Sequence, residues 1–596
     1  MTATQLEITM DRNLKAAVPR SISQQVVANA LATVADEMAT TIFRTAHSTV
    51  VRDAMDFSAA LCSPIGETIA QAVTIPLHLG SIPTAMSALL KKFGANFVPG
   101  DVYIMNDPFA GGGHTPDIYV VKPAFFDEML VGFAITVAHH ADIGGRVPGT
   151  SACENTDIFQ EGLRFPWIRL YAAGNPVEDL LDVIRTNVRI PRMTMGDLNA
   201  QVAACNVGQL GLEELAARYG NAPLRELMEM LLDHTERVVR SDIAKWPDGS
   251  AEFTDYLDSD GIEVCDVPIR VKLTVAGDRV IADFSNSSPM VRGALNSTKS
   301  TTEASVYCAI MSAVKSDIPY TSGAFRPIEV VTIPGTITHV VTPGPSSMRG
   351  VTAFRIVDAV NGALAQLIPD RVAAAGEGGN ALAVFAGRND HEPFVYFELV
   401  AGAWGGGPTN NGNDGLCNPC GGAANIPVEF AEAEFPIFIE RYALVPDSGG
   451  AGKNRGGLAV ERAWRPLVPV VLHVRSDRYN HPPYGLNGGN SGTGSRNRIR
   501  RSNSSADELL GPMFSLELAA GDLYHHVIAG AGGWGDPLDH DPFSLAAEVA
   551  NGKVSIKAAL EEYGVAIKEA GAVDIEATNA RRSKLRAMLR ADIAPD

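Results

Sequence analysis

Cysteine is scarce in this sequence, with only seven among 596 residues. The seven are odd in number and scattered, which is typical of reduced intracellular thiols and excludes a disulfide-dense secreted scaffold. The closest pair, Cys417 and Cys420 in "CNPC", has no second pair at similar spacing and no thioredoxin-like unit around it. We therefore predict neither a structural zinc site nor a redox site at this pair.

Positive charge is also in deficit, because 49 Lys and Arg residues face 68 Asp and Glu residues and give a formal net charge of −19. No block of basic residues alternates with aromatics, which makes nucleic acid and anionic membranes poor partners. The N-terminal "MTATQLEITMDRNLKAAVPR" carries charges where a signal peptide needs an apolar segment. No apolar run approaches the roughly 18 residues of a membrane span. We therefore expect a cytoplasmic protein.

Several catalytic motifs are missing as well. The sequence contains no G-x-x-x-x-G-K-[ST] loop, no H-E-x-x-H helix and no G-x-S-x-G elbow. These absences argue against a nucleotide-driven motor, a zincin and an α/β-hydrolase. The glycine-rich segments lack the lysine of a phosphate-binding loop, so the chain has no recognisable ATP site of its own.

The length and the apolar content predict several packed units with sizeable cores. We predict an α+β fold, a multi-domain mixed α/β chain whose C-terminal half is glycine-rich and contains β-structure. A long core-facing helix is expected after Pro19, strand-like segments to about residue 170, and glycine-marked tight turns after 376. The predicted units are 21–245, a middle α/β domain at 246–375, a glycine-rich β domain at 376–540, and a helical segment at 541–596.

Residue types that can bind a metal or transfer a proton are concentrated in "NDPFAGGGHTPDIYVVKPAFFDEMLVGFAITVAHHADIGG". His114 and Asp117 lie on a loop that feeds one strand, and the return strand ends in His139 and His140. A two-residue turn places Asp117 opposite Ala138, and a three-residue turn places it opposite His139. Either way the histidines return beside His114 and Asp117, but the period of two cannot choose between His139 and His140.

Two imidazoles and a carboxylate that converge in this way are typical ligands of a catalytic divalent metal with one position open to water. The alternative is a set of core histidines satisfied by backbone hydrogen bonds, with an ordinary loop aspartate. A fourth ligand is available from Asp53 or Asp56 in "VRDAMDFS". On the metal hypothesis, 21–245 is the metal-binding catalytic domain.

Further motifs occur in order along the chain: "MDFSAALCSPIGE", "NDPFAGGGHTPDI", "AHHADIGGRVPGT", "NVRIPRMTMGDLNAQVAACNVG" and "GAGGWGDPLDHDP". Together they resemble the hydantoinase B/oxoprolinase family, the B-type subunits of N-methylhydantoinases, oxoprolinases and caprolactamase-like enzymes. The resemblance runs from about residue 20 to the end of the chain. It implies an A-type partner subunit that binds ATP and magnesium, and hydrolysis of cyclic amides such as hydantoins, 5-oxoproline or lactams. A more distant branch carboxylates acetone or acetophenone.

The resemblance also implies the site. The family's metal ligands fall on His114, Asp117 and His139, with Asp56 as the fourth, and the metal would be zinc or manganese. His140 and Asp142 become candidates for orienting ligands or holding a water. An ordinary structural role is expected for other polar groups near the motifs, which are His47, Asp107 and Glu161.

The mechanism that this supports is a hypothesis. Phosphorylation of the amide carbonyl on the partner subunit would activate it, and metal-bound water in this chain would attack the activated carbon. Asp53 or Asp142 would take or return a proton. The expected assembly is a heterotetramer with the A-type subunit. The alternative function is a subunit of an ATP-dependent acetone- or acetophenone-type carboxylase that uses the same ligands.

Overall fold

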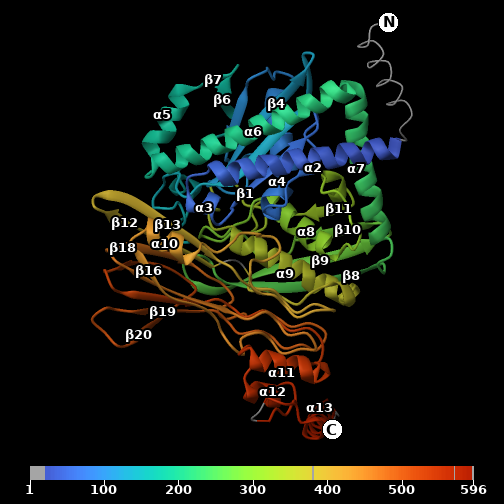
Figure 1. Cartoon of the computed structure of the whole chain (residues 1–596), viewed down its shortest axis with the longest axis vertical. Coiled ribbons are helices and arrows are strands. Elements are labelled where there is room, and N and C mark those ends of the chain that lie inside the picture. Colours follow the sequence, from blue (N-terminus) through green and yellow to red (C-terminus); the bar gives the residue numbers. More distant parts are fainter. Residues whose placement is uncertain (1–19, 379–380, 569–570, 594–596) are drawn as a thin grey trace, which may run out of the picture.

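The computed structural model describes residues 20–378, 381–568 and 571–593 (Figure 1). The fold is mixed α/β, as predicted, with helices on both faces of an N-terminal sheet. That sheet has seven strands in the order β2-β1-β5-β4-β3-β6-β7. Its strands are β1 (Phe57–Cys62), β2 (Thr68–Gln71), β3 (Val102–Met105), β4 (Asp117–Phe126), β5 (Met129–His139), β6 (Ile168–Ala172) and β7 (Asn175–Pro176).

The two faces of this sheet are covered by different helices. α2 (Arg20–Thr45) and α6 (Pro191–Tyr219) share a core with Ile118 and Val120 of β4. α4 (Pro76–Phe93) packs with the alternate residues Tyr119 and Val121 on the other face. The pleat thus buries both sides of β4, because successive side chains point to opposite faces. Shorter helices nearby are α3 (Thr49–Arg52) and α5 (Glu178–Asn187), and α7 (Asn221–Ile243) follows α6.

The long core-facing helix predicted after Pro19 is α2, in which Val27, Leu31, Met38 and Ile42 are buried on one face and Val34 is half-buried. Within the described residues, Gln24–Thr45 is also long and apolar enough to cross a membrane. A buried stripe packed on α6 is how a core helix behaves, so length and composition alone are weak evidence for a membrane span.

Among the helices that were not predicted, α4 and α9 (Gly350–Leu367) matter most for the site. The strand-like pattern expected up to residue 170 is interrupted by α4, which contains Pro83 and carries Gly80 against Ala304 of α8 (Lys299–Ala313). α9 is buried along nearly its whole length, so it lacks the polar face that makes a helix recognisable in sequence. Both helices begin beside the site described below.

The middle of the chain forms a second sheet with the order β11-β10-β9-β8. α9 packs on β8 and β9, and α8 lies between α4 and α9 (Figure 1). These elements are β8 (Gly249–Ser259), β9 (Val264–Ala276), β10 (Arg279–Asp283), α8 (Lys299–Ala313) and β11 (Ile328–Val331).

The C-terminal half holds a four-stranded and a five-stranded sheet, in the orders β13-β12-β18-β21 and β16-β17-β22-β19-β20. α11 (Pro542–Ala550), α12 (Ile556–Glu561) and α13 (Ile575–Ile593) protrude from the end of the molecule (Figure 1). The remaining elements are β12 (Ala381–Asn389), β13 (Glu392–Val400), β14 (Gly402–Ala403), β15 (Asp414–Leu416), α10 (Val428–Glu434), β16 (Ile437–Leu444), β17 (Val460–Pro466), β18 (Val470–Arg475), β19 (Arg496–Arg500), β20 (Asp507–Leu510), β21 (Met513–Leu518) and β22 (Leu523–Val527).

Glycines of this half do more than mark turns, which corrects the prediction. Backbone segments from 405–412, 449–457, 485–494 and 530–535 pack directly on one another, linked by bonds such as Gly450 N–H to Ala531 O. A β-carbon added at Gly456 would lie 2.0 Å from the Ala531 carbonyl oxygen, and one at Gly492 would lie 2.0 Å from that of Gly530. Glycine is therefore required here for close backbone approach.

The largest hydrophobic core crosses the predicted domain boundaries. It contains Val50 from the first predicted unit, Val271 and Phe354 from the second, and Val384 and Cys420 from the third. The first three units consequently share interior packing, and all the predicted boundaries stay predictions.

Candidate metal centre

The hairpin of β4 and β5 places Asp117 directly opposite His139. Its turn has two residues, Asp127 and Glu128, which both have positive φ, as a type I′ turn requires. A two-residue turn alone would put Asp117 opposite Ala138. The register shifts by one between Ala124 and Phe125, and this bulge moves His139 into line.

At each of the three glycines before His114, a side chain would clash with neighbouring atoms. Gly111 has a φ of +93° and lies against the Thr84 backbone, while a β-carbon on Gly112 would lie 2.8 Å from the carbonyl oxygen of Asp107. A β-carbon on Gly113 would lie 2.6 Å from Asp117 Oδ2. The glycine run therefore lets the loop fold tightly enough to aim His114 at Asp117.

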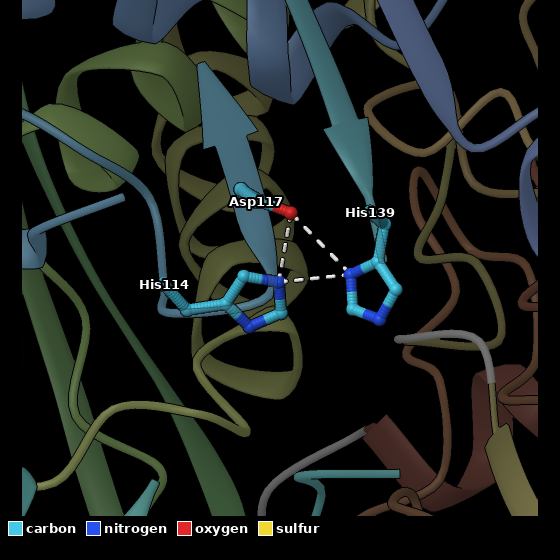
Figure 2. A group of neighbouring side chains, drawn as sticks. All are labelled: His114, Asp117 and His139. Carbon is cyan, nitrogen blue, oxygen red and sulfur yellow. Dashed lines mark hydrogen bonds and ion pairs between the residues drawn. The ribbon is translucent and has the colours of Figure 1, made fainter. Parts of the chain in front are cut away.

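Three donor atoms converge at this point, and Figure 2 shows them facing one another. His114 Nε2 lies 2.9 Å from Asp117 Oδ1 and 3.1 Å from His139 Nδ1, and His139 Nδ1 lies 3.3 Å from Asp117 Oδ1. A divalent ion about 2.1 Å from each ligand would separate them by about 3.0–3.4 Å in octahedral or tetrahedral geometry. The spacing of the three atoms fits such an ion.

The protonation of His114 gives an independent reason to place a cation here. His114 Nδ1 donates to the carbonyl oxygen of Ser347 at 2.7 Å, because a carbonyl can only accept. Burial lowers the pKa of His114 to about 3, so the ring is neutral at pH 7 and Nε2 carries a lone pair. That lone pair faces a carboxylate oxygen of Asp117. Two hydrogen-bond acceptors this close repel each other, and a metal ion bound between them would make the contact favourable.

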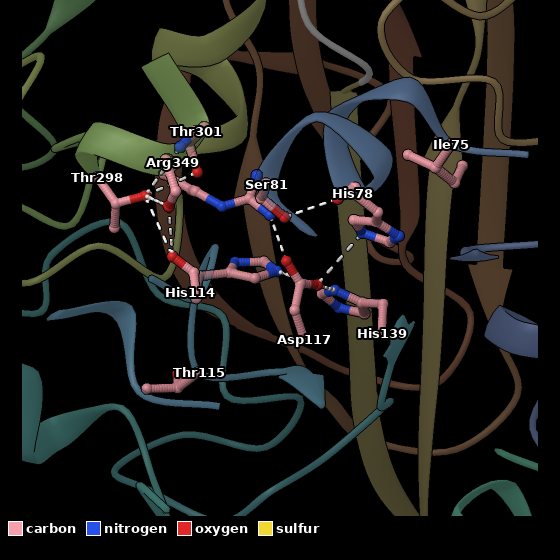
Figure 3. A network of polar contacts seen from close by, with 12 residues as sticks. Ile75, His78, Ser81, His114, Thr115, Asp117, His139, Thr298, Thr301 and Arg349 are labelled. Carbon is pink, nitrogen blue, oxygen red and sulfur yellow. Dashed lines mark hydrogen bonds and ion pairs between the residues drawn. The ribbon is translucent and has the colours of Figure 1, made fainter. Parts of the chain in front are cut away.

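Asp117 is fixed from two sides, as Figure 3 shows. Its Oδ1 faces the two histidines, and its Oδ2 is paired with the Arg349 guanidinium at the start of α9. Burial by itself would raise the pKa of the Asp117 carboxyl, but the charge of Arg349 holds it well below the usual range. A fully buried, ionised carboxylate is thus available as a ligand.

Asp56 and His78 form the next ring of groups. Asp56 immediately precedes β1 and accepts the His139 N–H through its backbone oxygen at 3.0 Å, and its side chain lies on the wall of the same cavity. His78, in the first turn of α4, has its Nε2 3.5 Å from Asp117 Oδ1 and 3.6 Å from Asp56 Oδ1. His78 was not among the predicted residues, since a lone histidine distant in sequence carries no spacing signal.

The two aspartates expected to transfer protons are not brought to this cavity. Asp53 pairs with Arg52 on the outer side of α3, with Nη2 and Oδ2 2.8 Å apart. Asp142 is fully buried and accepts from the backbone N–H groups of Gly144 and Gly149, and from Arg189. Its oxygens are therefore committed to holding a loop, which is a structural role.

The other expected groups lie around the centre without reaching it. His140 points to the opposite face of the hairpin, where its Nε2 lies 3.0 Å from Gln201 Oε1. The exposed His47 packs on Gly196 of α6, and Asp107 caps a short 3-10 turn. Glu161 accepts from the N–H groups of Ser346 and Ser347, and so holds the loop whose carbonyl orients His114.

The cavity around the centre has a volume of about 60 Å³, room for roughly two water molecules. Its polar wall carries Asp56, His78, the three converging groups and two arginines, Arg349 and Arg475. Ile75, Phe354, Leu382, Phe397 and Leu399 form its apolar side. The polar centre thus lies against a largely apolar wall, in a space smaller than a whole cyclic amide needs.

Comparison with known proteins gives consistent results. The family model described as hydantoinase B/oxoprolinase matches residues 20–537. The putative B subunit of a D-/L-hydantoinase from Pseudomonas sp. (strain NS671) is 30% identical over 578 residues, which cover 94% of this chain and 98% of that protein. The beta subunit of caprolactamase from Pseudomonas jessenii is 33% identical over 581 residues, 94% of this chain and 99% of the relative.

Solved structures give the same picture. The ATP-dependent caprolactamase of P. jessenii matches with a TM-score of 0.87 and 31% identity, covering 95% of this chain and 100% of that one. A nucleotide-free acetone carboxylase also has a TM-score of 0.87, over 96% of this chain and 84% of that one, but only 19% identity, so it shows a shared fold. The chain belongs to the hydantoinase B/oxoprolinase family.

Proposed function

We propose that this chain is the B-type subunit of a cytoplasmic, ATP-dependent cyclic amide hydrolase. The single observation that carries the proposal is the convergence of His114, Asp117 and His139, with a neutral imidazole lone pair facing a carboxylate. Relatives named for hydantoin and caprolactam support a cyclic amide as the substrate. We further propose that Asp56 is the fourth ligand, because its side chain lies on the wall of the same cavity.

A divalent ion, zinc or manganese, held by these residues would supply Lewis acidity and a hydroxide nucleophile at neutral pH. The chain's own residues set up that chemistry. The Ser347 carbonyl holds the His114 proton on Nδ1, which turns the Nε2 lone pair inward. Arg349 holds one oxygen of Asp117 and leaves the other toward the histidines.

Proton transfer is assigned to His78 in this proposal, in place of Asp53 and Asp142. His78 Nε2 lies within 3.6 Å of a carboxylate oxygen on Asp56 and within 3.5 Å of one on Asp117. Its Nδ1 is 3.5 Å from the Ser58 hydroxyl, so both ring nitrogens have polar neighbours. A histidine placed between two carboxylates can accept a proton from water and return it to the leaving amine.

Activation of the amide is assigned to a partner subunit. Amide resonance makes the carbonyl a poor electrophile, and this sequence contains no nucleotide-binding motif. Two relatives carry names that mark them as subunits, and the matching caprolactamase is ATP-dependent. We therefore propose an A-type partner that binds ATP and magnesium and phosphorylates the carbonyl oxygen, in a heterotetramer of two chains of each kind.

The experiment is an activity panel with the chain co-expressed with its A-type partner. Hydantoins, 5-oxoproline and caprolactam are supplied with and without ATP and bicarbonate, and ring-opened products are measured by mass spectrometry. Ring opening that needs ATP and is lost in Asp117→Ala supports the proposal, and His78→Gln should reduce kcat while metal content is kept. No opening of any cyclic amide by the metal-loaded complex would overturn it.

The carboxylase alternative rests on the fold shared with acetone carboxylase. At 19% identity this likeness is weaker than the 31% shared with caprolactamase, which favours the hydrolase. Acetone and acetophenone with bicarbonate complete the panel, and a carboxylated product from either ketone would replace the hydrolase proposal.

A further inference from the structure

Two buried arginines lie on the wall of the metal cavity. Arg349 ends the "SSMR" turn before α9 and is 3% exposed, and Arg475 ends β18 and is 6% exposed. They are near neighbours, because a β-carbon on Gly350 would lie 3.2 Å from Arg475 Nη1. Two guanidinium groups from distant parts of the sequence therefore share one small polar cavity.

Three carboxylates lie close to these arginines. Asp117 pairs with Arg349, and Asp56 is the second carboxylate on the wall. The third is the buried Glu377, which acts on Arg475 by its charge. Two arginines and three carboxylates leave one negative charge, so a divalent ion at the centre would leave a surplus of one positive charge. Burial and the neighbouring Arg349 lower the pKa of Arg475 to about 10, while the charges of Asp56 and Glu377 act in the opposite direction.

Two further features favour a bound anion. The N-terminus of α9, an 18-residue helix, lies at the cavity wall through Gly350, and helix N-termini attract negative charge. Arg349 Nε is buried and has no hydrogen-bond partner among the described residues. The same is true of His139 Nε2 within the described part of the chain. Both nitrogens belong to residues of the cavity wall and can donate to a ligand oxygen.

We propose that Arg349, Arg475 and the N-terminus of α9 bind the phosphoryl group of the activated substrate, a carbonyl O-phosphate. The inference rests on the proposed function, because that function supplies a phosphorylated carbonyl as the species that reaches this chain. The surplus of positive charge favours an anion, and guanidinium groups are well suited to phosphate oxygens. The cavity of about 60 Å³ accommodates a group of this size but not a whole ring.

The test uses the full-length chain loaded with zinc or manganese and needs neither partner nor turnover. Isothermal titration calorimetry measures binding of inorganic phosphate and of acetonylphosphonate, a non-hydrolysable carbonyl phosphonate. Wild type should bind both, and Arg475→Gln should weaken both at least tenfold, since a charge-assisted hydrogen bond is lost. Arg441→Gln, which removes an exposed arginine on β16, is the matched control and should bind as wild type does.

Elemental analysis reports whether each variant still holds its metal. If Arg475→Gln loses the ion, Arg475→Lys, which keeps the positive charge, takes its place and should bind intermediately. The proposal is overturned if neither variant holds metal, if phosphonate binding is equal in wild type and variant, or if wild type binds inorganic phosphate alone. Phosphate binding without any ring opening in the activity panel would contradict the proposed function and leave this anion site standing, so the two failures are distinguishable.

Discussion

At the scale of single residues, the metal centre depends on the small size of Gly113 and the neutral state of His114 as well as on the identity of its ligands. Gly113 leaves room for the Asp117–Arg349 pair, and the neutral His114 offers a lone pair. The sequence predicts that the His139–His140 pair returns to His114 and Asp117, because a hairpin must return its histidines to the loop, and only the family resemblance selects His139. It cannot predict the register, since the extra residue at the Ala124/Phe125 bulge has no sequence signature.

We expect Gly113→Ala to weaken metal binding at least tenfold. The added methyl would lie 2.6 Å from Asp117 Oδ2 and 2.7 Å from Arg349 Nη2, so the carboxylate must move. Competition titration with a chromophoric chelator measures the affinity. Gly511→Ala is the control, because its β-carbon would meet only Val264 at 3.6 Å, and affinity equal to wild type in both variants would contradict the prediction.

Glu161 gives a prediction for pH dependence. Burial raises the pKa of this carboxyl to about 8, against about 4.3 in an unfolded chain. The protonated form is therefore favoured by folding, and this stabilisation is complete below about pH 4.3 and lost as the pH rises through about 8. We expect Glu161→Gln, which keeps an acceptor for the Ser346 and Ser347 N–H groups, to flatten the fall in melting temperature between pH 5.5 and 8.5. An unchanged slope would show that Glu161 is ionised in the folded chain.

At the scale of secondary-structure elements, the core-facing helix α2 and the hairpin follow from periodicity and turn chemistry, and both were predicted. α4 and α9 were not, because one contains an internal proline and the other is buried all round. These two helices supply His78 and, just before α9, Arg349. Two of the groups that sequence reasoning missed thus lie on, or next to, elements that it missed.

The packed glycine segments of the C-terminal half should be intolerant of any side chain. A methyl on Gly456 would lie 2.0 Å from the backbone oxygen of Ala531, and a backbone atom cannot rotate away. We expect Gly456→Ala to cost about 1–3 kcal/mol of stability. Differential scanning calorimetry should show a lower melting temperature than for Gly511→Ala, which lies in an open position. Equal melting temperatures would mean that these glycines serve only as turn residues.

At the scale of the whole molecule, the shared core explains why domain boundaries are hard to read from the sequence. Apolar residues from the first three predicted units meet in one core, so composition shifts along the chain do not mark separate folding units. The metal cavity lies among these units, with Asp56 from the first, Phe354 from the second and Leu382 from the third. Its assembly therefore depends on most of the chain.

The division of labour between subunits gives a further prediction. The metal-loaded chain alone should leave an unactivated cyclic amide intact, because it has a site for a nucleophile but no nucleotide motif. Addition of the A-type partner and ATP should start ring opening. Chromatography of the ring-opened product measures it. Hydrolysis by the isolated chain at a rate comparable to that of the complex would instead identify a self-contained metallohydrolase.

The most direct test of the central claim is the metal content of the purified chain. The claim is that His114, Asp117 and His139 hold a divalent ion, because their donor atoms converge within 3.3 Å and a lone pair faces a carboxylate. Inductively coupled plasma mass spectrometry of wild type and His114→Ala, after dialysis against a weak chelator, measures it. The account predicts one zinc or manganese per wild-type chain and almost none in the variant. Equal metal content in the two proteins, or no divalent metal in wild type after supply of both ions, would contradict it.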